Sequence, residues 1–563
     1  MPQLRQDIGR YGDSHTPGPN DSYADNLDVD VLIVGAGFGG VYLLHHLRKL
    51  GFKVKIYEAG TDIGGIWHWN SYPGARVDTH VPLYEYSIPE VWKDWTWSER
   101  FPGYAELRSY FDHVEKVLGV KKDIALNTRV VGADFDQTSE KWIVKTEDGR
   151  TARAKYFILA TGFAAKRHFP DWPGLESFEG IMHHSSFWPE GGVNVKGKRV
   201  AVVGTGSTGV QIAQECGPEA AELTVFQRTP NLSLPMRQRK LTPEEQNESK
   251  GRYPELYKHR LTTFAGFDFD FAKKNTFDDT PEEREAFYQK LWDDGGFNFW
   301  LATYKDMLYV EKANREAYNF WARKTRARIH DPVKRDILAP LEPPHPFGTK
   351  RPSLEQNYYD QFNSDHMNVI DIKKNPIVGI EPKGIRLEDG FLHECDVIAL
   401  ATGFDSLTGG MKSMGLRNIH GQPLSETWAQ GTWSYLGMTC NGYPNMLFLY
   451  GAQGPTAFAN GPTCVEVQAD WIVSAIVKAK AEGIKRIDPT REAEEEWRRK
   501  VKEISDTTLF PSTDSWYMGA NIPGKPREQL NYTGGIPKYD EECQATLPEW
   551  KGFVTVGAWL EMA

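Results

Sequence analysis

The sequence predicts an α/β protein with two Rossmann-like dinucleotide-binding domains and a helical insertion. Two glycine-rich turns with GxGxxG spacing, residues 35–40 and 204–209, each follow a short apolar run and precede a helical pattern. A third stretch, from about Met236 to Ala339, interrupts this alternation with charged helical patches. Two dinucleotide sites in one chain indicate electron transfer between two bound nucleotides.

The first glycine-rich turn lies between a predicted buried strand, residues 29–34, and a predicted helix, residues 42–50. Glycines permit a tight turn here and let the backbone approach a pyrophosphate at the helix N-terminus. The next strand, residues 53–57, ends in Glu58, at the spacing where a carboxylate accepts a ribose hydroxyl. The alternative, for either turn, is a purely structural connection between strand and helix. The residues assigned to this site, which we expect to hold FAD, are Gly35, Gly37, Phe38, Gly40 and Glu58.

The second turn repeats this layout, with predicted strands at residues 199–203 and 222–226 and a helix at residues 207–216. Where the first copy has its carboxylate, the second has Gln227, and an arginine follows. Loss of the carboxylate beside a guanidinium favours a 2′-phosphate, which arginine binds through paired charge-assisted hydrogen bonds. We therefore expect NADPH at this site, bound by Gly204, Gly206, Ser207, Thr208, Gly209, Arg228 and Thr229.

Two similar strand ends, at residues 156–162 and 396–403, each finish an apolar run with Ala-Thr-Gly or Leu-Ala-Thr-Gly. We place the domain crossings just after them. The predicted organisation is an N-terminal arm at 1–27, an FAD domain at 28–165 and 401–563, an NADPH domain at 166–235 and 336–400, and a helical insertion at 236–335. The aromatic side chains of the insertion either pack against the neighbouring domain or line a substrate entrance.

Composition narrows the range of functions. The net charge of −10, with no basic block, argues against a nucleic-acid partner. The five cysteines include no CxxC pair and no metal-ligand spacing, which predicts a reducing compartment and no metal site. The polar N-terminus lacks the apolar core of a signal peptide, and no run of 18 apolar residues occurs. We therefore expect a cytoplasmic protein without a membrane span, either a monomer or a homodimer.

Four further motifs carry a resemblance to a known family. The chain has FxGxxxHxxxWP at residues 178–189, GGxWxxxxYPGxxxD at residues 64–78, Gly-Thr-Lys-Arg-Pro at 348–352 and Ser-Trp-Tyr-Met-Gly-Ala-Asn at 515–521. It resembles the type I Baeyer–Villiger monooxygenases, which are class B flavoproteins, over nearly its whole length from about residue 29. The first of these motifs is formed by Phe178, Gly180, His184, Trp188 and Pro189.

The resemblance implies an FAD- and NADPH-dependent monooxygenase that inserts one oxygen atom of O2 next to a ketone carbonyl. The product is an ester or a lactone, and the reaction passes through a flavin C4a-peroxide. By resemblance, the catalytic residues are Arg351, which stabilises the developing anion, and Asp78, which holds and tunes Arg351. Without the family motifs, Asp78 would be interpreted as a loop-capping carboxylate and Arg351 as a member of a surface ion pair.

The resemblance also implies roles for other residues. Lys350 is expected to contact the NADPH 2′-phosphate, and Trp516 to close over the nicotinamide ribose from a mobile loop. The segment with His184 and Trp188 is expected to link the two nucleotide domains and couple their movement, in preference to direct proton transfer. The remaining cofactor-binding residues are Gly65, Trp67, Tyr72, Asp78, Tyr84 and Val130, and the substrate-lining residues are Thr456, Ala457 and Phe458.

The sequence departs from the family around the catalytic carboxylate. Family members often have Cys-Asp-Ile-Glu-Ser where this chain has Val-Asp-Thr-His-Val at residues 77–81. Phe458 adds an aromatic surface to the substrate loop. Both changes leave the choice of ketone open.

Two rival functions remain at this stage. A heteroatom oxygenase acting on sulfides or amines would use the same cofactors. A disulfide reductase or a non-catalytic redox sensor would use the same two-nucleotide scaffold. Absence of a CxxC pair disfavours the reductase, and the presence of both Asp78 and Arg351 disfavours the sensor.

Overall fold

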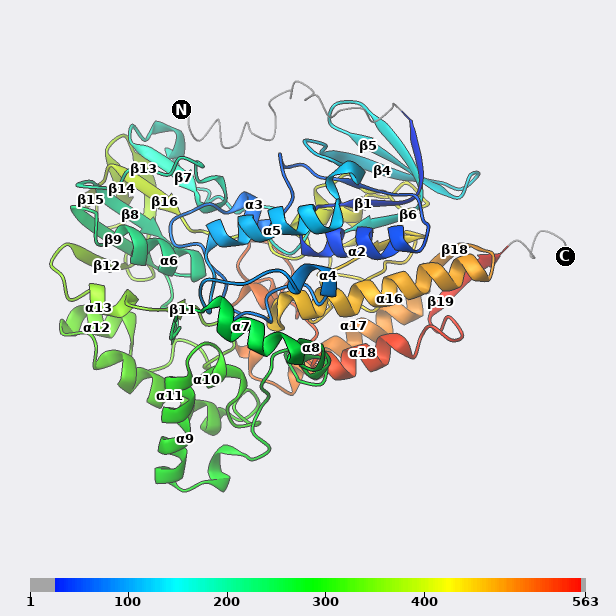
Figure 1. The fold of residues 1–563 in the computed structure, drawn as a ribbon. Coiled ribbons are helices and arrows are strands. Elements are labelled where there is room, and N and C mark those ends of the chain that lie inside the picture. Colours follow the sequence, from blue (N-terminus) through cyan, green and yellow to red (C-terminus); the bar gives the residue numbers. More distant parts are fainter. Residues whose placement is uncertain (1–25, 558–563) are drawn as a thin grey trace.

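The computed structural model describes residues 26–557. The predicted N-terminal arm, residues 1–27, lies almost entirely outside this range. Two sheets stand side by side, one mixed and one entirely parallel, and helices α7 to α12 gather on one side of the molecule (Figure 1).

The first sheet has the strand order β3-β2-β1-β6-β5-β4, with β17 paired to β6. Its parallel strands β1 and β6 are in register, with Ile33 opposite Ile158. The apolar runs of both strands are buried because helices α2 and α16 pack against the sheet. The strands are β1 (Leu27–Val34), β2 (Val54–Tyr57), β3 (Ile124–Ala125), β6 (Thr151–Leu159) and β17 (Met446–Phe448), with the antiparallel hairpin β4 (Val130–Asp136) and β5 (Lys141–Thr146).

The second sheet is entirely parallel and has the order β12-β9-β8-β16-β7. A small antiparallel sheet lies between β12 and β16 in the chain. The main strands are β7 (Ile181–His184), β8 (Arg199–Val203), β9 (Glu222–Gln227), β12 (Met367–Asp371) and β16 (Val397–Leu400), and the small sheet contains β13 (Ile377–Glu381), β14 (Gly384–Leu387) and β15 (Leu392–Glu394).

The elements expected around the two glycine-rich turns form close to the predicted positions. The strand at 199–203 and the helix at 207–216 match their predicted bounds, as β8 and α6 (Ser207–Cys216). Helix α2 (Phe38–Lys49) begins four residues earlier than predicted, because the glycine turn itself enters the first helical turn at Gly37.

The chain passes between the two sheets twice, once after β6 and once after β16. The two connecting segments lie alongside each other. The His168 N–H donates to Gly403 O at 3.0 Å, and the Asp405 N–H donates to Lys166 O at 2.8 Å. The two connections therefore form a single paired hinge.

The stretch predicted as a helical insertion contains α7 (Pro243–Ser249), α8 (Tyr253–Arg260), α9 (Pro281–Asp294), α10 (Asn298–Leu301), α11 (Glu311–Arg326) and α12 (Pro332–Leu338). Helix α9 begins with a capping box in which Thr280 and Glu283 bond each other's backbone N–H groups. The two ends of the stretch return to the same place, where β10 (Leu234–Pro235) pairs with β11 (Leu354–Glu355).

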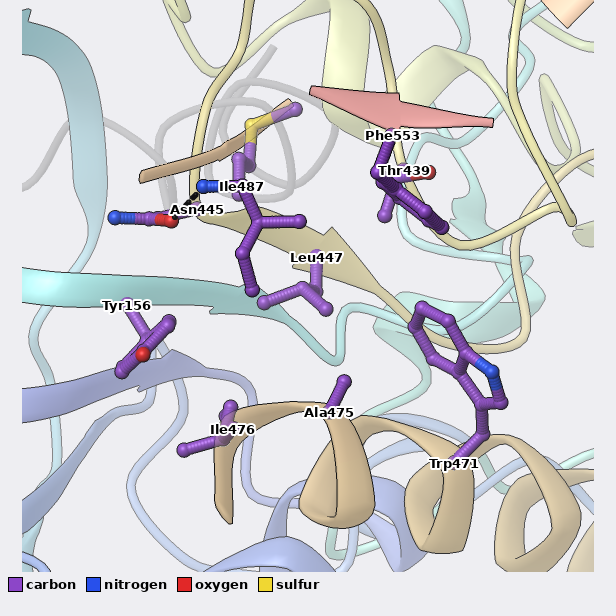
Figure 2. A pocket seen from close by; sticks show the side chains of 10 residues that line it. Tyr156, Thr439, Asn445, Leu447, Trp471, Ala475, Ile476, Ile487 and Phe553 are labelled. Carbon is purple, nitrogen blue, oxygen red and sulfur yellow. Dashed lines mark hydrogen bonds between the residues drawn. The ribbon is translucent and has the colours of Figure 1, made fainter. Parts of the chain in front are cut away.

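The C-terminal part returns to the first sheet through α16 (Gly461–Ala481), α17 (Arg491–Asp506) and α18 (Ile536–Gln544), and the short sheet of β18 (Ile484–Pro489) and β19 (Phe553–Gly557). A buried cavity of about 10 Å³ lies between β17, α16 and this sheet, lined by Leu447, Trp471 and Ile476 (Figure 2). Asn445 accepts the Ile487 N–H at 2.8 Å beside it. This space is about the volume of one water molecule, so it is a packing gap.

Among residues 26–557, no helix combines the length and apolar character needed to cross a bilayer. All five cysteines fall within these residues; each is buried and none forms a disulfide.

Candidate active site

Arg351 and Asp78 lie 273 residues apart in the chain and meet near both glycine-rich turns. Ser353, two residues after Arg351, bonds Ser207 of the second turn. Tyr84, which lies within the field of both charges, packs against Phe38 of the first turn. Arg351 donates from Nε to Asp78 Oδ2 and from Nη2 to Asp78 Oδ1, both at 2.8 Å. This is the two-pronged geometry that a planar guanidinium and a carboxylate form best. Burial alone would lower the pKa of Arg351, but the Asp78 carboxylate outweighs it and raises that pKa above its ordinary value. Arg351 therefore remains a cation at every physiological pH.

Aromatic side chains from the helical insertion cover this cation. The Arg351 guanidinium lies 4.8 Å from the ring centroid of Phe297 and 5.9 Å from that of Trp300. The Trp300 indole N–H donates to Gly348 O at 3.2 Å, which fixes the loop that carries Arg351. Of the aromatic residues of the insertion, these two thus serve the site directly, although both are buried.

The first glycine-rich turn has the close packing that its sequence predicts. Gly35 has φ +104°, and a Cβ there would lie 2.5 Å from Ala160 O. Gly37 and Gly65 approach each other backbone to backbone, since a Cβ on Gly37 would lie 3.3 Å from the Gly65 Cα. A Cβ on Gly40 would overlap Gly35 O. Gly35, Gly40 and Gly65 therefore leave no room for a Cβ, and Gly37 would hold one only in a tight contact.

Glu58 ends β2 beneath this turn and is buried. Its carboxylate accepts the N–H groups of Ala36 and Gly60, each at 2.7 Å. Burial raises the pKa of Glu58, and these two hydrogen bonds oppose that effect. The carboxylate is thus held rigidly against the turn, with further lone pairs for a ribose hydroxyl.

The other residues expected near the flavin are spread around the same region. Trp67 donates from its indole N–H to Tyr84 Oη at 3.0 Å, and the Tyr84 ring packs edge-on against Phe38. Tyr72 instead reaches the second turn, where its hydroxyl donates to Gln211 Oε1 at 2.8 Å. Val130 is buried at the start of β4.

The second glycine-rich turn resembles the first. Gly204 has φ +108°, and Cβ atoms at Gly204 and Gly209 would overlap Ala401 O and Gly204 O. A Cβ at Gly206 would meet nothing within 4 Å, so the turn is open at that point. Ser207, the first residue of α6, accepts a hydrogen bond from the Ser353 hydroxyl at 3.1 Å, and the Thr208 hydroxyl lies 3.4 Å from Tyr72 Oη.

Basic residues gather beside this turn. Arg228 and Thr229 follow β9 directly, and Thr229 O accepts the Thr205 hydroxyl at 2.7 Å. Burial, with smaller contributions from Arg228 and Lys373, lowers the pKa of Lys350 to about 8, against the attraction of Asp514. Lys350, Arg228 and Lys373 therefore repel one another, and a bound anion would reduce this repulsion.

His184 belongs to the hinge between the two sheets. It is fully buried at the end of β7, with Nδ1 at 2.9 Å from Ser186 Oγ and Nε2 at 3.1 Å from Gly403 O. Burial lowers the pKa of His184 to about 3. His184 is therefore neutral near pH 7, and its contact with Gly403 O fixes the second connecting segment.

The other residues of this motif surround that hinge. Phe178 and Trp188 are buried, and a Cβ on Gly180 would lie 2.5 Å from Asp396 O. Ser71 donates to Trp188 O at 2.9 Å, directly before Pro189, which ties the motif to the loop leading to Asp78.

The predicted substrate-lining loop and the segment around Trp516 show backbone strain and aromatic packing. Thr456 has φ +40°, which a β-branched residue rarely adopts. The ring of Phe458 is 5.5 Å from Trp300, and it therefore belongs to the same aromatic cluster that covers Arg351. Trp516 stacks on Phe163 of the first connecting segment at 5.6 Å. Ala457 lies in the same loop as Thr456, in a short 3-10 turn.

The altered residues beside Asp78 make a contact of their own. His80 Nε2 lies 3.1 Å from Asp268 Oδ1, and the His80 ring stacks on Phe269. The loop that carries Asp78 is thereby joined to the insertion, next to the aromatic cluster.

Comparisons with known proteins agree with this geometry. A family model described as "Pyridine nucleotide-disulphide oxidoreductase" matches residues 29–252, which include both glycine-rich turns. The FAD-binding monooxygenase acrE of Aspergillus aculeatus is 52% identical over 97% of this chain and 92% of its own length. Cyclopentanone 1,2-monooxygenase of Comamonas sp. is 47% identical over 93% and 94%, and the Baeyer–Villiger monooxygenase of Pseudooceanicola batsensis is 36% identical over 93% and 95%. The chain belongs to the Baeyer–Villiger monooxygenase family.

Solved structures of Baeyer–Villiger monooxygenases and their relatives share the fold. The closed crystal structure of cyclohexanone monooxygenase superposes with a TM-score of 0.91 at 36% identity, covering 95% of this chain and all of the other. A structure of OTEMO in complex with FAD and NADP gives a TM-score of 0.90 at 33% identity, covering 94% and 99%.

Sequence reasoning missed several residues of this monooxygenase that the fold places at the site. Phe297 and Trp300 were noted for their aromatic character but not for contact with Arg351. Lys373 lies just after β12. The residue before it, Ile372, donates its N–H to Gln227 O at 2.9 Å, next to Arg228. Lys373 comes close to Arg228 only because β12 pairs with β9. Local sequence patterns do not predict which strands pair.

Proposed function

We propose that this Baeyer–Villiger monooxygenase holds FAD at the turn of residues 35–40 and NADPH at the turn of residues 204–209, and converts ketones with O2 into esters or lactones. The observation that carries this proposal is the partly buried, two-pronged ion pair of Arg351 with Asp78. A permanent cation at this point suits a reaction that develops negative charge on a carbonyl oxygen.

The residues around the first turn fit FAD. The mutual approach of Gly37 and Gly65 leaves bare backbone where a pyrophosphate has to come close, and α2 begins there with free N–H groups. Glu58 would bind the ribose of FAD. Trp67 and Tyr84, which bond each other, would lie next to the flavin ring. Reduced FAD supplies the activated oxygen, and the protein supplies positioning and charge.

The residues around the second turn fit NADPH. The open space at Gly206 admits a pyrophosphate, and the neighbouring cations Arg228, Lys350 and Lys373 suit a 2′-phosphate. The neutral amide of Gln227 is used elsewhere, donating to Ile337 O at 2.8 Å. The residue after the apolar run of β9 is thus a neutral amide, whereas the Glu58 carboxylate follows β2 in the first copy.

Within this arrangement each residue has one task. Arg351 stabilises the oxyanion that forms at the ketone carbonyl, since its charge does not depend on losing or gaining a proton. Asp78 orients Arg351 through both of its oxygens. Phe297 and Trp300 cover the guanidinium with aromatic rings, and Phe458 packs against Trp300. Exclusion of water by these rings strengthens the field of the guanidinium.

The experiment that tests this function is NADPH- and O2-dependent conversion of cyclic, linear and aromatic ketones, with the products identified by mass spectrometry. Esters or lactones carrying one atom from ¹⁸O2 support the proposal. A purified, FAD-loaded enzyme that oxidises sulfides or amines but no ketone would favour heteroatom oxygenation instead. The related enzymes named for cyclopentanone and cyclohexanone favour the ketone.

We also propose a cytoplasmic enzyme, as a monomer or a homodimer, because its five buried thiols suit a reducing compartment. Sedimentation velocity measures the oligomeric state directly.

The coenzyme preference should depend on Arg228. Arg228→Ala should weaken NADPH binding by about 1.5–3 kcal/mol, since one charge-assisted contact to the 2′-phosphate is lost. The Michaelis constant for NADPH should therefore rise roughly 10- to 100-fold, while that for NADH changes little. A wild-type enzyme that uses both coenzymes equally would contradict this assignment.

NADPH affinity should also depend on pH through Lys350. Its pKa of about 8 means that the free enzyme carries this charge below pH 8 and loses it above. A bound 2′-phosphate favours the charged form, so kcat/KM for NADPH should fall as the pH rises through about 8, while kcat/KM for NADH stays level. Lys350→Met should remove this pH dependence and lower the affinity at neutral pH. Parallel pH profiles for the two coenzymes in the wild type would contradict it.

A further inference from the structure

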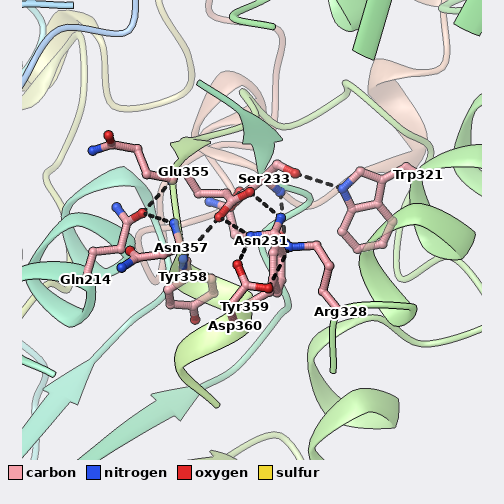
Figure 3. Close-up of polar contacts among 11 residues, drawn as sticks. Gln214, Asn231, Ser233, Trp321, Arg328, Glu355, Asn357, Tyr358, Tyr359 and Asp360 are labelled. Atoms are coloured by element: carbon pink, nitrogen blue, oxygen red, sulfur yellow. Dashed lines mark hydrogen bonds and ion pairs between the residues drawn. The ribbon is translucent and has the colours of Figure 1, made fainter. Parts of the chain in front are cut away.

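The Asn231 side chain joins the NADPH turn to the segment that carries Arg351. Its Nδ2 group donates to Thr205 O at 2.8 Å and to Ser353 Oγ at 2.7 Å. Its Oδ1 atom accepts the Ser353 N–H at 3.1 Å and the Ser233 hydroxyl at 3.1 Å. Figure 3 shows Asn231 among neighbouring polar residues that include Ser233 and Tyr359. All four hydrogen-bonding positions of the amide are thus in use.

The two groups that Asn231 connects have separate tasks. Thr205 lies within the glycine-rich turn, between Gly204 and Gly206. Ser353 lies two residues after Arg351 and also donates from its hydroxyl to Ser207 Oγ, at the start of α6. Both Asn231 and Ser353 therefore bind the turn that we propose for NADPH.

The link from Ser353 to Arg351 is short and stiff. Pro352 stands between them, and its ring fixes its own φ angle and restricts the conformation of the residue before it. A displacement of Ser353 is therefore passed to the Arg351 backbone with little loss. The Arg351 side chain is held at its other end by Asp78.

We propose that Asn231 is a positioning residue for Arg351, which couples the placement of the catalytic guanidinium to occupancy of the nucleotide turn. The inference rests on the proposed function, since it takes NADPH at residues 204–209 and catalysis at Arg351. Through this link, a bound nucleotide that orders the turn also holds the Arg351 segment in place.

The neighbouring contacts in Figure 3 have a structural task and supply the control. Arg328 pairs with Glu355 and Asp360, which fastens the end of the insertion to the strand after Ser353. The Tyr359 hydroxyl donates to Asn231 O at 2.8 Å, which supports the Asn231 backbone and not its side chain. Tyr359→Phe should therefore loosen the region without cutting the link from Thr205 to Ser353.

The test uses the FAD-loaded enzyme and the variant Asn231→Asp, which keeps the size of the side chain but loses both donated hydrogen bonds and puts a negative charge against Thr205 O. Hydrogen–deuterium exchange is followed with and without NADP⁺. In the wild type and in Tyr359→Phe, NADP⁺ should slow exchange in residues 204–209 and in residues 349–355. In Asn231→Asp, protection should persist at 204–209 and be lost at 349–355.

Turnover gives a second readout. At saturating NADPH, the fraction of consumed NADPH that appears as ester should fall about tenfold in Asn231→Asp, the size expected for two lost hydrogen bonds, with hydrogen peroxide released instead. Ser353→Ala should reproduce the loss, and the double variant should lose little more, because both residues act on one link. If Asn231→Asp does not fold, the ester yield of Ser353→Ala tests the same link.

A raised KM for NADPH, with unchanged ester yield at saturation and unchanged NADP⁺ protection at 349–355, would overturn the coupling role. A wild type that shows the coupled protection but makes no ester from any ketone would refute the proposed function and the catalytic part of this inference, while still showing the link between the nucleotide turn and residues 349–355.

Discussion

Arg351→Ala should lower the rate of ester formation from ketones by at least about 10³-fold while FAD and NADPH remain bound. The guanidinium is the permanent cation near both turns, and removal of a preorganised charge or donor from a developing oxyanion costs about 10²–10³ or more in kcat. The measurement is product formation by gas chromatography, with the flavin content read from the absorbance of the purified variant.

The companion variants separate the charge of Arg351 from its geometry. Arg351→Lys keeps the charge but loses the two-pronged contact with Asp78, so it should remain strongly impaired. Asp78→Ala should lose less than Arg351→Ala, and the double variant should be no worse than Arg351→Ala, since both residues form one unit. Sulfide oxidation forms no carbonyl oxyanion and should suffer less. Wild-type ketone turnover in Arg351→Ala would remove this residue from the mechanism.

Gly37→Val should yield a folded protein without its yellow flavin. A Cβ at Gly37 already stands 3.3 Å from the Gly65 Cα, and valine adds two methyl groups to a turn whose backbone has to reach the pyrophosphate. FAD occupancy, measured as the ratio of flavin to protein absorbance, should fall at least about tenfold.

The second turn provides the matched control. A Cβ at Gly206 meets nothing within 4 Å, so Gly206→Val should fold and retain FAD but lose affinity for NADPH. Circular dichroism and thermal unfolding check that both variants fold. If Gly37→Val stays fully yellow, or if Gly206→Val loses FAD instead of NADPH affinity, the assignment of the two turns is wrong.

The elements around each nucleotide site were predictable because their signals are local. Strand, glycine turn, helix and second strand occupy one continuous stretch of about 25–30 residues, and glycine is required where φ is positive or where a Cβ would overlap the backbone. The same reasoning distinguishes Glu58 from Gln227 at the two strand ends. Helix α2 was misplaced at its start because the turn and the first helical residues share one glycine-rich sequence.

The partnership of Arg351 with Asp78 was available from the sequence only through family resemblance. They stand 273 positions apart, and the chain between them contains strands β7, β8 and β9 of the second sheet and the insertion. No periodicity spans such a distance. The roles of Phe297, Lys373 and Asn231 had no local signal at all. An isolated phenylalanine, lysine or asparagine has the same local pattern whether it faces solvent or a catalytic site.

By itself, the sequence determined that this chain has two glycine-rich turns between strand and helix, and that a carboxylate follows the first copy and an arginine the second. Those features follow from turn chemistry and hydrophobic periodicity over short distances. The tertiary structure alone decided that the insertion folds back over Arg351, that β12 brings Lys373 beside Arg228, and that Asn231 reaches both turn and catalytic segment. Apart from the bond of Asn231 to Thr205, which spans 26 positions, these contacts join residues more than 50 positions apart through strand pairing and packing, which local patterns do not encode.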